Sequence, residues 1–328
     1  MHCRRGLTRR DFLRTTAAAA GAVLAGPAAF AQSTPDKSRV IIARNGAVTK
    51  GGEIVEDVLA RMVDAAVTAL TGEADAAKAW GKLFSTDETI GLKPNGLGGP
   101  MLSTATALIK VCVERLQGIG VPSEKIIIWE RSPADFVVCG LDVSEKAWGA
   151  TCIPSDAGFD EPVTSGAFTG RLAQVVTKRI DAYIDLPIIK DHNIAGVTGA
   201  LKSVFGSVME PGQYHVPGCD PHIADIYSLP PFRGKSRLIV TDGTRATCEG
   251  GPQFNPLFAW NANLILAATD PVANDAQIWK IVDAQREANG LMPLEAVGRK
   301  PKSILTAAER GLGNADEARI EVEELAPA

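Results

Sequence analysis

Residues 182–202 read AYIDLPIIKDHNIAGVTGALK, and this stretch carries the pattern that decides the fold. Its first eight residues are mostly apolar and do not alternate with polar ones, which indicates a strand buried on both faces. Gly196 and Gly199 then free the backbone for a tight turn, and a helix is predicted to start at Ala200. A buried strand that leads into a helix is the repeating unit of a parallel α/β sheet.

The same pattern recurs on both sides of this stretch. Buried strands are predicted at 40–43, 88–92, 125–130, 236–241 and 262–268, helices at 51–72, 103–116 and 271–286, and an edge strand at 318–325. We therefore expect residues 38–328 to form a single α/β domain, with a mostly parallel sheet and helices on both faces. The less regular region 147–170 is expected to be a small cap or insertion.

Residues 1–31 have a different character. A basic start precedes an Ala-rich apolar run, and Ala29-Phe30-Ala31 fits a cleavage site for a secreted protein. The run of about 17 residues is short and weakly apolar for a membrane span. Within the leader, TRRDFLR (residues 8–14) resembles the twin-arginine export signal.

That resemblance implies export of a folded protein, often with a cofactor already loaded. We expect residues 1–31 to be a signal peptide cleaved near Ala31 and residues 32–37 to be a linker. The mature protein would lie in the periplasm without a stable membrane anchor, and the twin-arginine export machinery would be a partner.

Charge and cysteine content exclude several classes of function. The chain carries 34 basic and 38 acidic residues. Because residues 1–31 hold five Arg and one Asp, the mature part has a net charge of −8, which disfavours nucleic-acid binding. The mature part has five cysteines and no C-x-x-C pair, so no iron–sulfur cluster is expected. One disulfide in an oxidising compartment is left open.

Ligands of parallel α/β folds bind at the carboxyl ends of the strands, so we searched the predicted strand-to-loop junctions. Four junctions carry polar residues and stand out: 93–100, 190–202, 242–252 and 270–275. The first reads KPNGLGGP, in which Lys93, Asn95 and close-approaching glycine backbone suit a phosphate or carboxylate. The alternative is an ordinary glycine-rich turn.

His192 and Lys202 belong to the second junction and were interpreted in two ways. In the first, both side chains face one pocket, where His192 moves a proton and Lys202 holds an anion or bonds to a carbonyl. Gly196 and Gly199 would let the backbone approach the ligand. In the second, His192 caps the turn and Lys202 is solvated.

The next segment, EPGQYHVPGCDPHIADIY, brings a thiol and two imidazoles within eight residues. His215, Cys219 and His222 are candidate ligands of zinc, nickel or copper, although their spacing matches no standard site. The alternative is a polar loop that leads into a helix.

Acidic residues follow two of the later strands. Asp242 and Glu249 lie in a loop and are therefore candidate ligand-binding residues. Asp270 precedes Pro271 and is expected to cap the helix that begins there.

Several of these motifs together resemble the family catalogued as domain of unknown function 362. The motifs occur in order as IGLKPN, DLPIIKDHNIAGVTGALKSVFG, TDGTRATCEGGP and AATDPVANDAQIW, over residues 90–279. Many members of that family carry an added ferredoxin-like cysteine cluster, which this chain lacks. The resemblance implies an α/β fold and little settled function.

A shorter resemblance concerns the stretch HNIAGVTGALK (residues 192–202), which is similar to a segment of the lactate racemase family. In that family the matching histidine is catalytic and the matching lysine holds a nickel-pincer nucleotide, which implies those roles for His192 and Lys202. Ala200 replaces a glycine of that segment. His215 or His222 would take the place of the nickel ligand, but neither has the matching spacing.

These observations lead to a functional hypothesis with one alternative. We expect an exported enzyme that binds an anionic small molecule or a nucleotide-like cofactor at His192 and Lys202. The alternative is a periplasmic carrier of a metal or a small acid that performs no turnover. Which cofactor or metal binds is not defined by the sequence.

Overall fold

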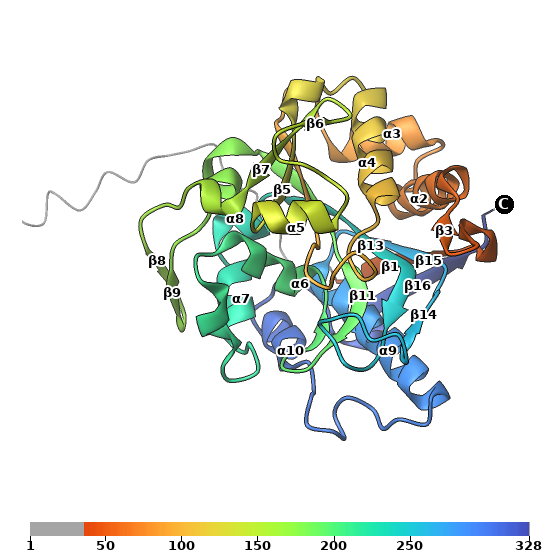
Figure 1. Cartoon of the computed structure of the whole chain (residues 1–328), viewed down its shortest axis with the longest axis vertical. Coiled ribbons are helices and arrows are strands. Elements are labelled where there is room, and N and C mark those ends of the chain that lie inside the picture. Colours follow the sequence, from red (N-terminus) through yellow and green to blue (C-terminus); the bar gives the residue numbers. More distant parts are fainter. Residues whose placement is uncertain (1–35, 328) are drawn as a thin grey trace, which may run out of the picture. The chain divides into compact units, whose positions relative to one another are not determined.

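A mixed β-sheet forms the middle of the part of the chain that the computed structural model describes, residues 36–327 (Figure 1). The strands of this sheet are β1 (Ser38–Arg44), β4 (Ile90–Pro94), β5 (Ile126–Glu130), β6 (Lys146–Ala147), β7 (Ala150–Pro154), β10 (Ala182–Leu186), β11 (Ile188–His192), β12 (Gly196–Thr198), β13 (Ser236–Thr247), β14 (Ala259–Trp260), β15 (Leu264–Ala268) and β16 (Ile320–Leu325). Two short hairpins lie outside it, β2 (Thr49–Lys50) with β3 (Glu53–Ile54) and β8 (Val163–Ser165) with β9 (Phe168–Gly170).

The helices surround this sheet. They are α2 (Glu56–Thr71), α3 (Ala76–Leu83), α4 (Thr106–Gly118), α5 (Pro133–Val138), α6 (Ala200–Ser203), α7 (His222–Tyr227), α8 (Pro230–Arg233), α9 (Pro271–Ala288) and α10 (Lys302–Glu309). Shorter helical turns are η1 (Gly46–Val48), η2 (Ser123–Lys125), η3 (Ser155–Ala157), η4 (Val175–Arg179), η5 (Val204–Ser207), η6 (Pro211–His215) and η7 (Glu317–Arg319).

The central strands are parallel, as the sequence predicts. The sheet runs in the order β16, β1, β15, β13, β10, β4, β5, β7 and β6, and the five strands from β13 to β7 are parallel to one another. β15 is antiparallel to both β13 and β1. β16 lies at the edge, as expected, and pairs with β1 in parallel. The predicted mostly parallel sheet is therefore confirmed, with an antiparallel addition on one side.

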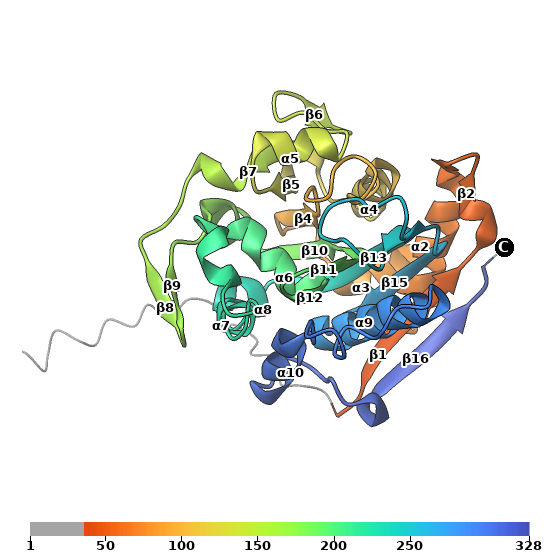
Figure 2. The ribbon, with the colours of Figure 1, turned by 60° about the horizontal axis from the view of Figure 1, so that its bottom comes forward.

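Both faces of the sheet are buried, which explains why its strands are continuously apolar. In β5, Ile126 and Ile128 join one core, whereas Ile127 and Trp129 join the other. Helices α2 and α9 pack on opposite sides of β15 (Figure 2). Since successive side chains of a strand point to opposite faces, a strand covered on both sides has no solvent-facing position.

Asp270 fixes the start of the long helix α9, as predicted. Its carboxylate accepts hydrogen bonds from the backbone N–H groups of Val272 and Ala273. It also accepts a hydrogen bond from the Ser38 hydroxyl at 2.5 Å and one from the Asn314 backbone at 2.8 Å. The cap therefore also ties the first strand to the segment that precedes β16.

The region 147–170 differs in part from the expected insertion. β7 pairs with β5 in parallel and β6 pairs with β7, so the first part of this region extends the main sheet. Only β8 and β9 form a separate hairpin, which projects beside α7 in Figure 1. β7 reads ATCIP, in which Thr151 and Pro154 interrupt the apolar pattern, so it lacks the continuous apolar run that marks the other strands.

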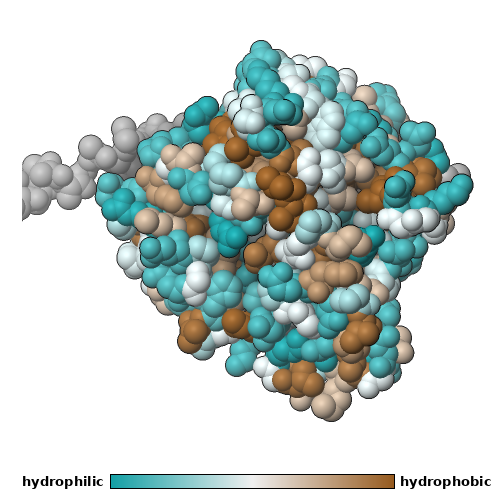
Figure 3. Space-filling model, viewed as in Figure 1, coloured by the Kyte–Doolittle hydropathy of each residue, from teal (hydrophilic) through white to brown (hydrophobic). Residues whose placement is uncertain are grey.

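The sequence also led to predictions about the cysteines and about residues 1–31. The five cysteines after residue 31 are all buried as free thiols, so no disulfide joins them. The expected signal peptide and its cleavage site lie outside the described residues, as does most of the linker. None of the helices within residues 36–327 is long and apolar enough to cross a membrane. On the face in Figure 3, apolar side chains form separate groups among polar ones.

Candidate functional site

A pocket opens at the carboxyl ends of the parallel strands β4 and β5, where the fold predicts a ligand site. The hollow measures about 540 Å³ with its open mouth included. We call it the Lys202 pocket. Its lining residues are Lys93, Asn95, Leu97, Glu130, Arg131, Asp135, Thr198, Lys202, Ser203, Phe205, Gly206, Pro211 and His215.

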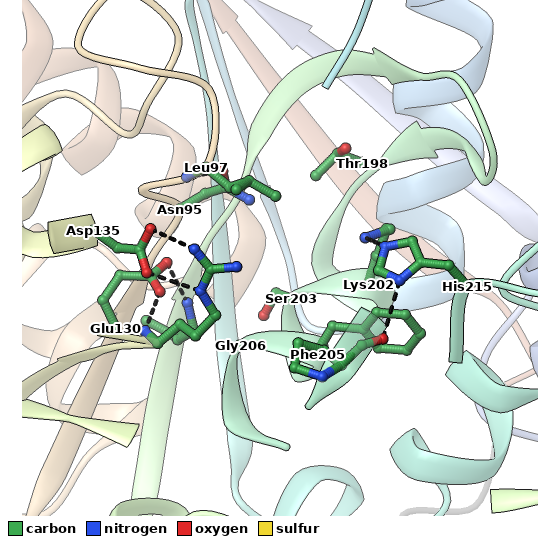
Figure 4. A pocket seen from close by; sticks show the side chains of 13 residues that line it. Asn95, Leu97, Glu130, Asp135, Thr198, Lys202, Ser203, Phe205, Gly206 and His215 are labelled. Carbon is green, nitrogen blue, oxygen red and sulfur yellow. Dashed lines mark hydrogen bonds and ion pairs between the residues drawn. The ribbon is translucent and has the colours of Figure 1, made fainter. Parts of the chain in front are cut away.

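One side of the pocket carries charges that are already paired (Figure 4). The Lys93 ammonium donates to Glu130 at 2.7 Å and to the Pro94 carbonyl at 2.7 Å. Arg131 forms a two-pronged ion pair with Asp135, each bond 3.0 Å long. Lys93 was predicted to hold an anion, but its charge is cancelled by Glu130 inside the protein.

Lys202 lies on the opposite side of the pocket, next to His215 (Figure 4). Its side chain is almost fully buried, and no carboxylate of the described residues pairs with it. The amine lies 3.4 Å from His215 Nε2 and 4.8 Å from the centre of the Phe205 ring. Burial lowers the pKa of Lys202 to about 8.

His215 is oriented so that its unprotonated nitrogen faces Lys202. Its Nδ1 lies 3.0 Å from the Pro211 carbonyl, and because a carbonyl oxygen only accepts, Nδ1 must carry the hydrogen. Nε2 is then the acceptor that meets the Lys202 ammonium. Burial, and then the charge of Lys202, lower the pKa of His215. The neutral imidazole is thus an acceptor for a proton of Lys202.

His192 does not line the pocket. Its Nδ1 accepts hydrogen bonds from the Ile194 and Ala195 backbone N–H groups, so the interpretation of His192 as the cap of the turn is confirmed. The ring stacks on His215 with centroids 5.8 Å apart. Burial, and then Lys202 and His215, hold the pKa of His192 far below its usual range. A proton-moving role for His192 near neutral pH therefore has no support in this geometry.

Gly196 and Gly199, the two glycines of the stretch 190–202, let the backbone pack closely against other parts of the protein, and they do not border the pocket. Gly196 has a φ of +84°, and a Cβ there would meet the Arg299 carbonyl. A Cβ on Gly199 would lie 2.2 Å from the Asp275 carboxylate. That carboxylate accepts hydrogen bonds from Ala200 and Leu201 and so caps α6 from α9. The sequence analysis predicts that both glycines approach the ligand, but neither of them lines the Lys202 pocket.

Asp242 and Glu249 are also placed elsewhere. The buried Asp242 carboxylate accepts a hydrogen bond from the Ala105 backbone and two from Thr244, which fixes the start of α4 against β13. Glu249 forms ion pairs with both Arg286 and Arg299. Their predicted cofactor-binding role is therefore not supported, because both carboxylates are occupied by the protein itself.

The ion pairs of Glu249 extend to Asp191 and form a second charged group. Arg299 binds Asp191 at 3.0 Å, and Arg286 also donates to the Cys248 carbonyl at 2.7 Å. We call Asp191, Glu249, Arg286 and Arg299 the closed cluster. Two cations meet two carboxylates there, so the cluster is neutral.

The predicted metal site is not assembled in the structure. Within residues 36–327, no three His, Cys, Asp or Glu side chains lie together in a way that could hold a metal ion. His215 packs against Phe205, whereas the His222 ring packs edge-on against Tyr214. The expected metal site at His215, Cys219 and His222 has no support in this arrangement, because the two imidazoles pack against different aromatic rings.

Several residues of the site were missed by the sequence analysis. Glu130 ends a buried strand, and that position was a usable signal. Thr198 lines the pocket, and its buried hydroxyl has no hydrogen-bond partner among the described residues. Ser203 lines the pocket as well and donates at 2.7 Å to Asp185, whose pKa burial raises to about 8. Only the folded arrangement brings these residues to one pocket.

Lys190 is a third buried lysine near the pocket, after Lys93 and Lys202, and its amine is held by two oxygen acceptors. Its amine donates to Asn95 Oδ1 at 2.9 Å and to the Leu97 carbonyl. Burial lowers its pKa to about 7. Lys190 and the pocket residue Asn95 therefore hold the glycine-rich 93–100 loop in place, which supports the interpretation of that loop as a structural turn.

Comparison with known proteins yields a family and little else. No curated protein matches the chain. A crystal structure of a protein from Thermotoga maritima is 10% identical, with a TM-score of 0.40 over 74% of this chain and 61% of that chain. The present chain thus spans less than two thirds of that protein. The model of the domain of unknown function DUF362 matches residues 90–280, more than half of the sequence. The chain belongs to the DUF362 family.

Proposed function

We propose that the protein is an enzyme whose Lys202 pocket binds an anionic small molecule or a nucleotide-derived cofactor. The charges that line the pocket carry this proposal. Lys93, Arg131 and Lys202 face Glu130 and Asp135, which leaves one positive charge without a carboxylate. A buried ammonium without a counter-ion is unfavourable, and an anionic ligand would supply the missing charge.

Turnover is supported by the pair that Lys202 forms with His215. An amine with a lowered pKa, next to a proton acceptor held by a third group, matches the arrangement of an activated nucleophile. The Pro211 carbonyl is the third group here. The carrier alternative, with a metal at His215, Cys219 and His222, lacks an assembled donor set in the described residues.

We also propose that the protein acts in the periplasm after twin-arginine export. This rests on the leader pattern TRRDFLR and the small residues around Ala31. The ligand and the export machinery are its proposed partners, and the acidic mature chain is not proposed to bind nucleic acid.

Native mass spectrometry of protein purified from its own periplasm tests the proposed binding. We expect wild-type protein to carry a small anionic molecule that is lost in Lys202→Met. A matched control is Lys235→Met, because Lys235 is a half-buried lysine outside the pocket lining, held by three backbone carbonyls. Equal ligand content in wild type and Lys202→Met would contradict the proposal, as would a ligand retained by Lys202→Met but lost in the control.

A further inference from the structure

The Lys202 amine has fewer oxygen acceptors than the buried Lys190 and the half-buried Lys235. Lys190 donates to a side-chain and a backbone oxygen, and Lys235 donates to the carbonyls of Val176, Thr177 and Ile180. Among residues 36–327, Lys202 meets only the nitrogen of His215 and the face of the Phe205 ring. An amine in this setting can approach an electrophile in the pocket without breaking a bond to a backbone carbonyl.

A second observation points to an oxygen-bearing ligand. Thr198 is 4% exposed, lines the same pocket as Lys202, and has a hydroxyl with no partner among the described residues. A buried hydroxyl without a partner is unfavourable, and a ligand oxygen would satisfy it. In Figure 4 Thr198 and Lys202 border the same space, with Ser203 on its floor.

We propose that the ligand is a small anionic carbonyl compound, a 2-oxo acid or an anionic aldehyde, and that Lys202 binds its carbonyl carbon covalently as an imine. This deepens the proposed function and rests on it. The negative group of the ligand compensates the positive charge of the pocket, and Thr198 hydrogen-bonds a ligand oxygen. Both the charge and the hydroxyl are features of the pocket that the protein leaves unmatched.

The chemical step balances with groups already present. His215 Nε2 accepts a proton from the Lys202 ammonium, and the free amine then attacks the carbonyl carbon to form a carbinolamine. The carbinolamine hydroxyl takes up a proton from His215 and leaves as water, and a C=N bond forms. The net change is Lys202 ammonium plus carbonyl to protonated imine plus water, with His215 returned to its neutral form and with no oxidation or reduction.

Reductive trapping tests this proposal directly. Wild-type protein is incubated with glyoxylate and cyanoborohydride, which reduces an imine to a stable secondary amine, and modified lysines are located by peptide mass spectrometry. We expect Lys202 to be modified at least about tenfold faster than Lys235 and Lys190, whose amines are held by oxygen acceptors. Preferential modification of Lys190 would overturn the proposal, because it would show that a lowered pKa alone selects the lysine.

Glycolate, the alcohol analogue of glyoxylate, separates the imine from simple anion binding. Glycolate should raise the melting temperature of the protein and slow the modification of Lys202. A glycolate effect without Lys202 modification would overturn the imine and leave anion binding in place. No glycolate effect together with no modification would overturn both.

Two variants sharpen the test. Lys202→Arg retains the positive charge and should keep the glycolate effect while losing the modification at this position. Thr198→Val should slow modification of Lys202 several-fold while leaving the slow modification of Lys235 unchanged. An unchanged rate in Thr198→Val would overturn the role of Thr198.

Discussion

Arg286 and Lys202 are both buried cations in the same domain, yet the protein surrounds them in opposite ways. Arg286 meets the Glu249 carboxylate and the carbonyls of Cys248 and Met292. Lys202 meets one imidazole nitrogen and one phenyl ring. In the closed cluster each cation forms an ion pair with a carboxylate of the protein, and these pairs hold loops together. In the Lys202 pocket the ammonium has no carboxylate partner among the described residues, so its charge is available to a ligand. A buried charge therefore marks a ligand site only when its partners are missing.

The largest effect is expected from breaking the closed cluster. Arg286→Met leaves Glu249 with only Arg299 and leaves the Cys248 carbonyl without its donor. Removing one partner of a buried ion pair costs about 3–5 kcal/mol of unfolding free energy. Urea denaturation should show this loss. The control Lys280→Met removes a solvent-exposed ion pair with Glu317 and should change stability by less than about 0.5 kcal/mol. Equal effects of the two variants would contradict the comparison.

Gly199→Ala should have the next largest effect. The new Cβ would lie 2.2 Å from the Asp275 carboxylate that caps α6, so helix and carboxylate must separate. Such overpacking costs about 1–3 kcal/mol. Because α6 carries Lys202, modification by glyoxylate should also slow. Gly46→Ala, where a Cβ meets nothing within 4 Å, is the matched control for urea denaturation. A fully stable Gly199→Ala protein would show that Asp275 does not hold α6.

Lys202→Met should act in the opposite direction to Arg286→Met. Removing a buried charge that lacks a counter-ion should raise the unfolding free energy by roughly 1–2 kcal/mol near neutral pH. The pKa of Lys202 is lowered from its ordinary 10.5 to about 8 in the folded protein, so the unfolded chain holds the proton more tightly. The penalty is complete below about pH 8 and is relieved as the pH rises toward 10.5.

The stabilisation by Lys202→Met should therefore shrink between about pH 8 and pH 10.5 in paired urea denaturations. Comparison of variant with wild type at each pH cancels the titration of other groups. A destabilised Lys202→Met protein would mean that Lys202 is a structural cation like Arg286.

The smallest effect on stability is expected for Thr198→Val. The hydroxyl makes no hydrogen bond within the described residues, so its removal should change the unfolding free energy by less than about 1 kcal/mol, in either direction. Thr244→Val is the matched control, because its hydroxyl donates to Asp242 at 2.7 Å and its loss leaves a buried acceptor weakened. Thermal denaturation of both variants makes the comparison. A larger loss for Thr198→Val than for Thr244→Val would contradict the assignment.

The fold could be predicted largely because burial on both faces leaves a strong mark on sequence. Strands such as β5 and β15 consist almost wholly of apolar residues. Asp270 followed by Pro271 indicates the start of α9. β7 has the same length as β5 but was not predicted, because Thr151 and Pro154 interrupt its apolar pattern. The order of the strands in the sheet depends on contacts between distant segments, so no local sequence pattern predicts it.

Sequence patterns pointed to the region where the pocket lies, but they identified only some of the residues that line it. The stretch 190–202 supplies Thr198 and Lys202 to the pocket lining, and Lys202 and the 93–100 loop meet at that pocket. What the sequence could not show is which polar groups the protein satisfies by itself. Glu130 forms an ion pair with Lys93, and Arg286 forms one with Glu249. The Asp275 carboxylate fills the space beside Gly199. Each partner is more than 30 residues away in the chain.

The central claim is that Lys202 is a buried amine without a counter-ion, and its titration tests this most directly. Lysine side-chain NMR signals would be followed against pH in wild-type protein and in Lys202→Met, which identifies the Lys202 signal by its absence. The account predicts a midpoint near 8 for that signal, and a shift to higher pH when glycolate binds. A midpoint at the ordinary value of 10.5, unaffected by glycolate, would contradict it.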